Sequence, residues 1–139
     1  MDQQVRQRVP DARVIYIDPR YAVGMTQPVM DAVQQAQTVI AAIFAVPVAG
    51  RVVRDASGSA TNQIAFKDAS AVLLQNVLET AAAKTVVVAM GNPYIAQQLP
   101  EVQTYMCTFS NVNVSELSAV KAMFGEHQLH EMAGAFLKR

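Results

Sequence analysis

The run Thr85-Val-Val-Val-Ala-Met90 decides the fold that this sequence predicts. It is apolar and largely β-branched, and Gly91-Asn92-Pro93 ends it at once. A strand without a polar side has to be covered on both faces, as strands of parallel sheets are. Residues 38–46 form a second, almost continuously apolar run that stops at Pro47. The two runs therefore predict two buried strands of one parallel sheet.

Strand and helix patterns alternate along the rest of the chain. The β-rich run Arg13-Val-Ile-Tyr-Ile17 and residues 103–109 predict two further strands. Helical spacing of apolar residues, with Pro28 suited to a first turn, predicts helices near 26–36, 69–83, 94–99 and 113–124. Residues 51–67 are polar and predict a long loop. This order predicts a single α/β domain over residues 1–139, with an open parallel sheet and helices on both faces.

The bulk composition excludes several classes of protein. Of the 139 residues 52% are apolar, which suits a folded domain, and the formal net charge is zero. We therefore expect neither nucleic acid nor a membrane as a partner. The first residues are polar, no apolar run is long enough to span a bilayer, and neither a signal peptide nor a transmembrane segment is expected. The single cysteine, Cys107, lies in an apolar run and is expected to be a buried structural thiol, so no compartment follows from it.

Motifs for common cofactors and nucleophiles are missing from the sequence. It contains no GxGxxG, no GxxxxGK[ST] and no GxSxG, so we expect no nucleotide cofactor and no hydrolase serine. His127 and His130, with Glu126 and Glu131, have a spacing that suits a metal ligand set. The same pattern also suits a solvated helix face, which we favour, and no metal is expected.

Polar residues follow the predicted strands, where open parallel sheets bind ligands. The candidate ligand-facing residues are Asp18, Arg20, Arg51, Asp55, Asn92, Tyr94, Ser110 and Asn111. The alternative is that most of these are turn and packing residues, with Asp55 a solvated loop aspartate.

Four segments carry a resemblance to a known family. These are Val9-Pro-Asp-Ala-Arg-Val-Ile-Tyr-Ile-Asp-Pro-Arg20, Gly91-Asn-Pro-Tyr94, Thr104-Tyr-Met-Cys-Thr-Phe-Ser-Asn111 and Val114-Ser-Glu-Leu-Ser-Ala-Val-Lys-Ala-Met-Phe-Gly125. Together they resemble the C-terminal domain of family 3 glycoside hydrolases, most of all the β-N-acetylglucosaminidase branch. The resemblance spans residues 5 to about 125.

The resemblance implies an α/β sandwich domain that accompanies a (β/α)8 barrel, and the barrel is absent from this chain. In the family an aspartate of the barrel is the nucleophile. The β-glucosidase branch takes its acid/base glutamate from the loop after the second strand, whereas in the N-acetylglucosaminidase branch a barrel histidine serves. Residues 47–67 contain no glutamate, and Asp55 is their one acidic residue. Two carboxyl groups about 5–5.5 Å apart are needed for retaining hydrolysis, so no catalytic residue is expected in this chain.

Residues 126–139 depart from the family pattern. Leu129, Met132, Ala133, Phe136 and Leu137 follow helical spacing, so we predict a helical tail over 127–137.

Three functions remain open at this point. The first is an accessory domain that packs on a glycosidase barrel and borders the sugar site. The second is a free-standing small-ligand or sugar-binding module. The third is a self-associating structural domain, for which we expect a homodimer.

Overall fold

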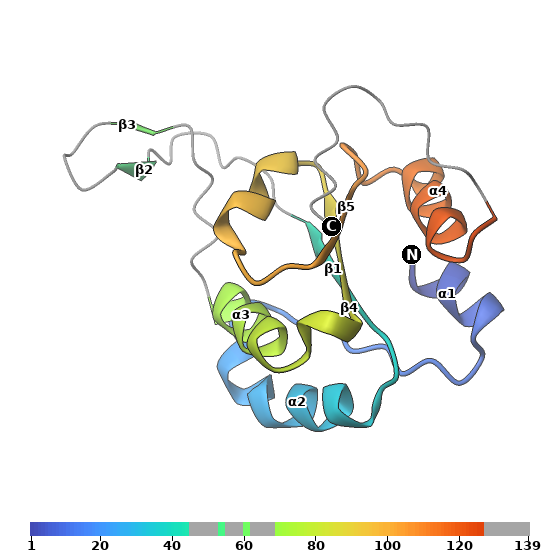
Figure 1. Cartoon of the computed structure of the whole chain (residues 1–139), viewed down its shortest axis with the longest axis horizontal. Helices are drawn as coiled ribbons and strands as arrows, with labels where there is room; N and C mark the ends of the chain where they lie inside the picture. The colour runs from blue at the N-terminus through green and yellow to red at the C-terminus, as the bar shows by residue number, and fades with distance from the viewer. Residues whose placement is uncertain (45–52, 55–59, 62–68, 127–139) are drawn as a thin grey trace.

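The predicted α/β architecture is present in the computed structural model of the chain, which describes residues 1–44, 53–54, 60–61 and 69–126 (Figure 1). Within these residues the main sheet has three parallel strands in the order β1-β4-β5. They are β1 (Val39–Phe44), β4 (Thr85–Met90) and β5 (Thr104–Cys107). A separate antiparallel pair consists of β2 (Val53–Arg54) and β3 (Ala60–Thr61), inside the segment predicted as a long loop.

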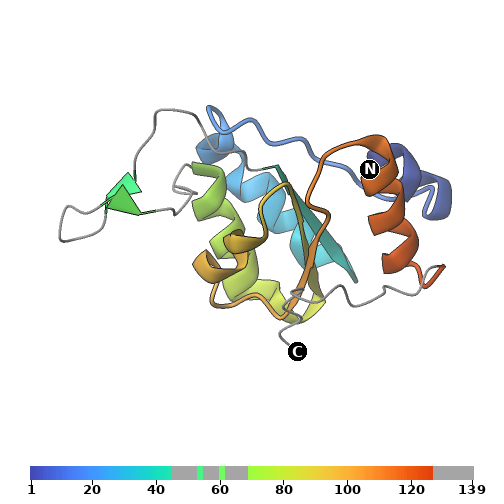
Figure 2. The ribbon, with the colours of Figure 1, turned by 90° about the horizontal axis from the view of Figure 1, so that it is seen from above.

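Helices cover both faces of the main sheet, as predicted. Figures 1 and 2 show α2 and α3 on one face, and α1 and α4 on the other. The helical elements are α1 (Asp2–Arg8), η1 (Ala22–Met25), α2 (Thr26–Gln35), α3 (Ala69–Ala81), η2 (Ala82–Lys84), η3 (Pro93–Gln98) and α4 (Asn113–Met123), of which those labelled η are 3₁₀ helices. None of the described helices is both long and apolar enough to cross a membrane.

The core forms around β4, the central strand. Alternate side chains of a strand point to opposite faces, and Val87 and Ala89 point toward α3 and η3. They pack there with Leu78 and Ile95, all at most 1% exposed. Val88 is fully buried on the opposite face, on the side of α4, whose Val120 is fully buried too. An entirely apolar β4 is therefore explained by its two covered faces.

A second cluster joins α2 to α3. Val29 and Val33 of α2 contact Leu73, Val77 and Ala81 of α3. These residues recur at helical spacing, and the sequence predicted both apolar faces for this reason. Pro28 is the third residue of α2, within the first turn, where its missing N–H leaves no helical bond unmade.

The strand predicted at Arg13–Ile17 is wrong: no strand is assigned to these residues. They form no backbone hydrogen bond to any other part of the chain that the structure describes. A β-rich sequence becomes a strand only when a neighbouring strand forms backbone hydrogen bonds with it. Whether such a neighbour is present depends on the tertiary structure.

Two other predictions needed adjustment at the ends of elements. The fourth strand is shorter than predicted and ends at Cys107 rather than Phe109. Of the core residues predicted for α4, Leu117 is half-buried and Phe124, just after the helix, is 39% exposed. The buried residues of the helix are Ala119 and Val120. The helix predicted for 127–137 and the histidines in it lie outside the described residues.

Candidate functional site at the carboxyl edge of the sheet

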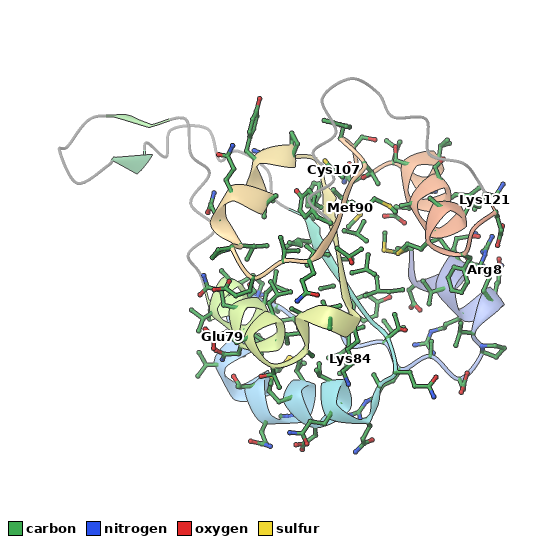
Figure 3. The ribbon with its side chains drawn as sticks, viewed as in Figure 1. Arg8, Glu79, Lys84, Met90, Cys107 and Lys121 are labelled. Atoms are coloured by element: carbon green, nitrogen blue, oxygen red, sulfur yellow. The ribbon has the colours of Figure 1, made fainter. Side chains whose placement is uncertain are left out.

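The three main strands end at a common edge of the sheet because they run parallel. Met90 and Cys107 mark this edge in Figure 3, and Lys84 lies at the opposite end of β4. Phe44 ends β1 at the same edge, opposite Met90 in the register. In open parallel sheets ligands bind beyond this edge, so its residues form the candidate site.

Asn92 and Tyr94 follow β4 and build the start of η3. The Asn92 side-chain oxygen accepts a hydrogen bond from the Tyr94 backbone N–H at 2.8 Å, with Pro93 in the first turn. The Tyr105 hydroxyl donates to the carbonyl oxygens of Asn92 and Pro93 at 3.3 and 3.2 Å. Burial raises the pKa of Tyr105, so this phenol stays protonated as a donor. Asn92 is thereby a capping residue, whereas the Tyr94 ring is 65% exposed.

Ser110 lies in a tight turn after β5. The Ser110 N–H donates to the Thr108 carbonyl at 2.6 Å, which closes a three-residue γ-turn around Phe109. Phe109 has a φ of 52°, in the left-handed region that costs a bulky residue about 1–3 kcal/mol. The Ser110 hydroxyl lies 2.6 Å from the Ser115 hydroxyl of α4, so a hydrogen bond joins the turn to the helix. Asn111 follows in an exposed position.

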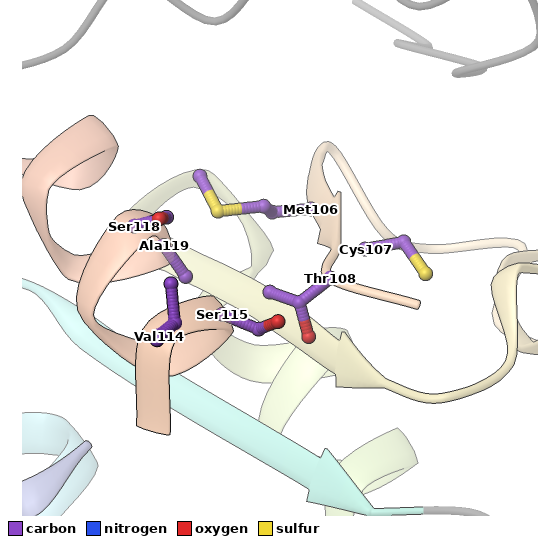
Figure 4. Close-up of a pocket in the computed structure, with 7 residues that line it drawn as sticks. All are labelled: Met106, Cys107, Thr108, Val114, Ser115, Ser118 and Ala119. Carbon is purple, nitrogen blue, oxygen red and sulfur yellow. The ribbon is translucent and has the colours of Figure 1, made fainter. Parts of the chain in front are cut away.

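A small cavity of about 200 Å³ lies between β5 and α4 (Figure 4). Its lining consists of Met106, Cys107, Thr108, Val114, Ser115, Ser118 and Ala119. The Cys107 side chain points away from α4 in Figure 4, and its sulfur accepts from the Phe109 N–H at 3.5 Å. Burial raises the pKa of the Cys107 thiol, so at neutral pH it is not a thiolate nucleophile. The hydroxyls of Thr108, Ser115 and Ser118 supply the polar part of the lining.

The remaining predicted residues do not join this group. Asp18 and Arg20 pair with each other at 2.5 Å in the loop before η1, and the Arg20 guanidinium stacks on Tyr21 at 5.6 Å. That loop follows Arg13–Ile17, which is not a strand, and η1 packs on α2 and α3. Arg51 and Asp55 lie outside the described residues.

Large apolar side chains, rather than polar ones, dominate the exposed part of this edge. Phe44, Tyr94, Phe109, Val112 and Val114, which we call the carboxyl-edge apolar surface, are all between 50% and 73% exposed. Phe44 ends β1, Tyr94 and Phe109 lie shortly after β4 and β5, and Val112 and Val114 lie at the start of α4. The sequence predicted the polar residues of these turns as the site and missed their apolar neighbours. No Asp, Glu, Lys, Arg or His lies in 90–94 or 107–115. The described part of this edge therefore offers no pair of carboxyl groups for acid/base chemistry.

The described residues also lack a metal centre, because no three of their His, Cys, Asp or Glu side chains gather in one place. Comparison of the chain with protein-family models, with curated proteins and with solved structures finds no match.

Proposed function

We propose that this chain is an accessory domain whose carboxyl-edge apolar surface packs against another folded domain. One observation carries the proposal: five large apolar side chains are at least half exposed at an edge whose described segments 90–94 and 107–115 contain no Asp, Glu, Lys, Arg or His. A monomeric protein seldom leaves such side chains together in water, because burying one of them fully is worth about 1.5–3 kcal/mol.

The resemblance to family 3 glycoside hydrolases suggests the identity of that other domain. It is the catalytic barrel of a glycosidase of the β-N-acetylglucosaminidase or β-glucosidase type. Carbohydrate would then be the partner of the assembled protein, and this chain would border the sugar site without supplying a catalytic group. The lack of charged residues in the described segments 90–94 and 107–115 supports this division of roles, since hydrolysis needs two carboxyl groups or a comparable acid/base pair.

A hydrolase assay tests the absence of catalysis. We expect the purified chain to release nitrophenol from aryl β-glucosides and aryl β-N-acetylglucosaminides no faster than buffer does. Turnover that survives repeated purification and disappears in Asp55→Asn would contradict the proposal.

A binding experiment tests the docking surface. The probe is the barrel of a family 3 β-N-acetylglucosaminidase that has been freed of its own C-terminal domain. We expect a one-to-one complex in sedimentation, weakened at least about tenfold by Phe109→Glu, because a charge buried at an interface must lose its hydration. Val72→Glu is the matched control, since Val72 is 54% exposed on α3. Equal effects of the two variants, or no complex at all, would count against docking through this edge.

The cavity between β5 and α4 favours a second candidate function, the binding of a small polar molecule. Its volume of about 200 Å³ lies below the roughly 300–1,000 Å³ typical of small-molecule pockets, so it suits a single small group. Monosaccharides at millimolar concentration would raise the melting temperature if this function held, and Ser115→Ala would reduce the shift. An unchanged melting curve with glucose and with N-acetylglucosamine would remove this candidate.

A further inference from the structure

Helix α1 lies beside α4 in both views of the ribbon, and none of its seven residues is buried (Figures 1 and 2). By contrast α2, α3 and α4 all bury apolar side chains. In water an isolated helix shorter than about 12–15 residues is at best marginally stable. α1 is therefore helical because its contacts with the rest of the chain hold it.

Arg8, in the last turn of α1, makes the contact with the end of α4. Its guanidinium donates to both carboxylate oxygens of Glu126, at 2.5 and 2.8 Å, and lies 5.8 Å from the centre of the Phe124 ring. The Arg8 side chain is 19% and the Glu126 side chain 42% exposed, so salt ions reach the pair. Exposed ion pairs stabilise only weakly, and salt screens them.

The end of α4 holds Glu126 in place for this contact. Gly125 has a φ of 71°, the left-handed conformation that closes a helix with a Schellman motif. The Glu126 N–H donates to the Lys121 carbonyl at 2.8 Å. The Gly125 N–H donates to the Ala122 carbonyl at 3.1 Å, which completes the motif. The acceptor for Arg8 is thus fixed by α4 itself.

The segment after α1 does not tie this helix into the sheet. Residues 13–17 form no backbone hydrogen bond with the rest of the described chain. The Tyr16 hydroxyl donates to an Asp2 carboxylate oxygen of α1 at 2.6 Å, but Tyr16 is 74% exposed. Ile15 packs against the cluster between α2 and α3, so the segment has its own attachment to the core. α1 can therefore separate from α4 without breaking any pairing of the sheet.

We infer that α1 is a salt-sensitive cover on α4, held by Arg8, which detaches and unfolds while the sheet and its other helices stay folded. Salt favours the detached state because it screens the pair between Arg8 and Glu126. Detachment uncovers the Phe124 ring, on which Arg8 lies in the docked state. Phe124 follows the end of α4, whereas Val112 and Val114 lie at its start. This change is therefore separate from docking through the carboxyl-edge apolar surface.

Hydrogen exchange measured residue by residue at two salt concentrations tests the detachment. Between about 0.05 M and about 1 M sodium chloride the Debye length falls from above about 10 Å to about 3 Å. We expect the hydrogen-bonded amides of α1 to exchange at least about threefold faster at the higher concentration, relative to an unfolded peptide in the same buffer. The amides of β4 should keep their rates. Exchange in α1 that ignores salt, or α1 amides without protection at low salt, would overturn the inference.

Arg8→Met and Arg6→Met form a matched pair, since each removes one arginine from α1. The Arg6 guanidinium bonds to Asp2 of the same helix at 2.6 Å and to the Ala12 carbonyl at 3.3 Å, whereas Arg8 bonds to Glu126 beyond α4. We expect Arg8→Met to give α1 its high-salt exchange rate already at low salt, while Arg6→Met keeps the salt dependence. Arg8→Glu combined with Glu126→Arg should restore it. Equal behaviour of Arg8→Met and Arg6→Met, with β4 still protected, would show that Arg8 does not hold α1.

Discussion

The ammonium group of Lys84 caps the C-terminal end of α2. Its Nζ donates to the carbonyl oxygens of Val33 at 2.6 Å and Ala36 at 2.7 Å, with that of Gln34 at 3.5 Å. The last carbonyls of a helix have no partner inside the helix, and they carry its partial negative charge. Lys84 immediately precedes β4, so this single side chain ties α2 to the central strand.

Lys84→Met tests this contribution while keeping the aliphatic part of the side chain. We expect the free energy of unfolding in urea to fall by about 1–3 kcal/mol, because at least two partly buried carbonyls lose a charged donor. Lys121→Met is the control, since the Lys121 ammonium makes no ion pair within the described residues, and a change of at most about 0.5 kcal/mol is expected. Equal losses in both variants would contradict the capping role.

The carboxyl group of Asp18 has a distinct pH signature. Hydrogen bonds from the Arg20 side chain and backbone lower the pKa of Asp18 to about 2. In the unfolded chain its pKa is about 3.9, so the ion pair stabilises the folded state above that pH. This contribution is lost as the pH falls from about 4 toward about 2. We expect an NMR titration of Asp18 to have its midpoint near 2, and Arg20→Gln to move it toward the ordinary value. Identical titrations in the two proteins would show that the pair does not form.

At the scale of elements, the turn between β5 and α4 contains a residue with a strained backbone. Phe109 has a positive φ, and a phenylalanine adopts this conformation only at a cost, whereas asparagine tolerates it. We expect the free energy of unfolding of Phe109→Asn to exceed that of Phe109→Val by at least about 1 kcal/mol. The reason is that a β-branched side chain is the least compatible with a positive φ. Thermal melts of the two variants decide the point, and equal stabilities would mean that the turn relaxes on substitution.

The tail remains a prediction at the element scale, since 127–139 lies outside the described residues. We predict an amphipathic helix over 127–137, with Leu129, Met132 and Phe136 on its buried face. Gly134 lowers its helix propensity by about 1 kcal/mol relative to alanine. Deletion of 127–139 should therefore expose apolar surface and lower the melting temperature. A deletion variant that melts at the temperature of the full chain would argue against this helix.

At the scale of the whole molecule, the carboxyl-edge apolar surface predicts self-association when no other domain covers it. The chain has zero formal net charge, so electrostatic repulsion between copies is weak. We expect a twofold dimer at micromolar concentration with at least about 1,000 Å² of total buried area. Sedimentation should show twice the chain mass of 15.1 kDa, and Val114→Glu should shift the distribution to monomer while Val72→Glu does not. A clean monomer of the unmodified chain would contradict the dimer.

Much of the fold was predictable because buried faces of helices and strands appear in the sequence as regularly spaced or continuous apolar residues. The apolar run 85–90 became the central strand, and the helical faces of α2 and α3 became the two core clusters. By contrast α1 has no buried residue and so no apolar periodicity to read. Arg8 attaches it to the far end of the chain, through an ion pair with Glu126 and a stacking contact with Phe124 at 5.8 Å.

For the candidate site, the sequence predicted where strands end and turns follow, but not which side chains are exposed there. The sequence by itself predicted strands that end at Met90 and Phe109, and the second of them ends two residues earlier, at Cys107. Only the tertiary structure decided that Asn92 caps η3 and that Ser110 hydrogen-bonds to Ser115 of α4. It also decided that Phe44, Tyr94 and Phe109 are exposed. It decided as well that 13–17 forms no backbone hydrogen bond with the rest of the described chain. The physical reason is common to both cases. Hydrophobic periodicity is a property of neighbouring residues in the chain, whereas a hydrogen-bond partner or a covered surface depends on segments that only folding brings together.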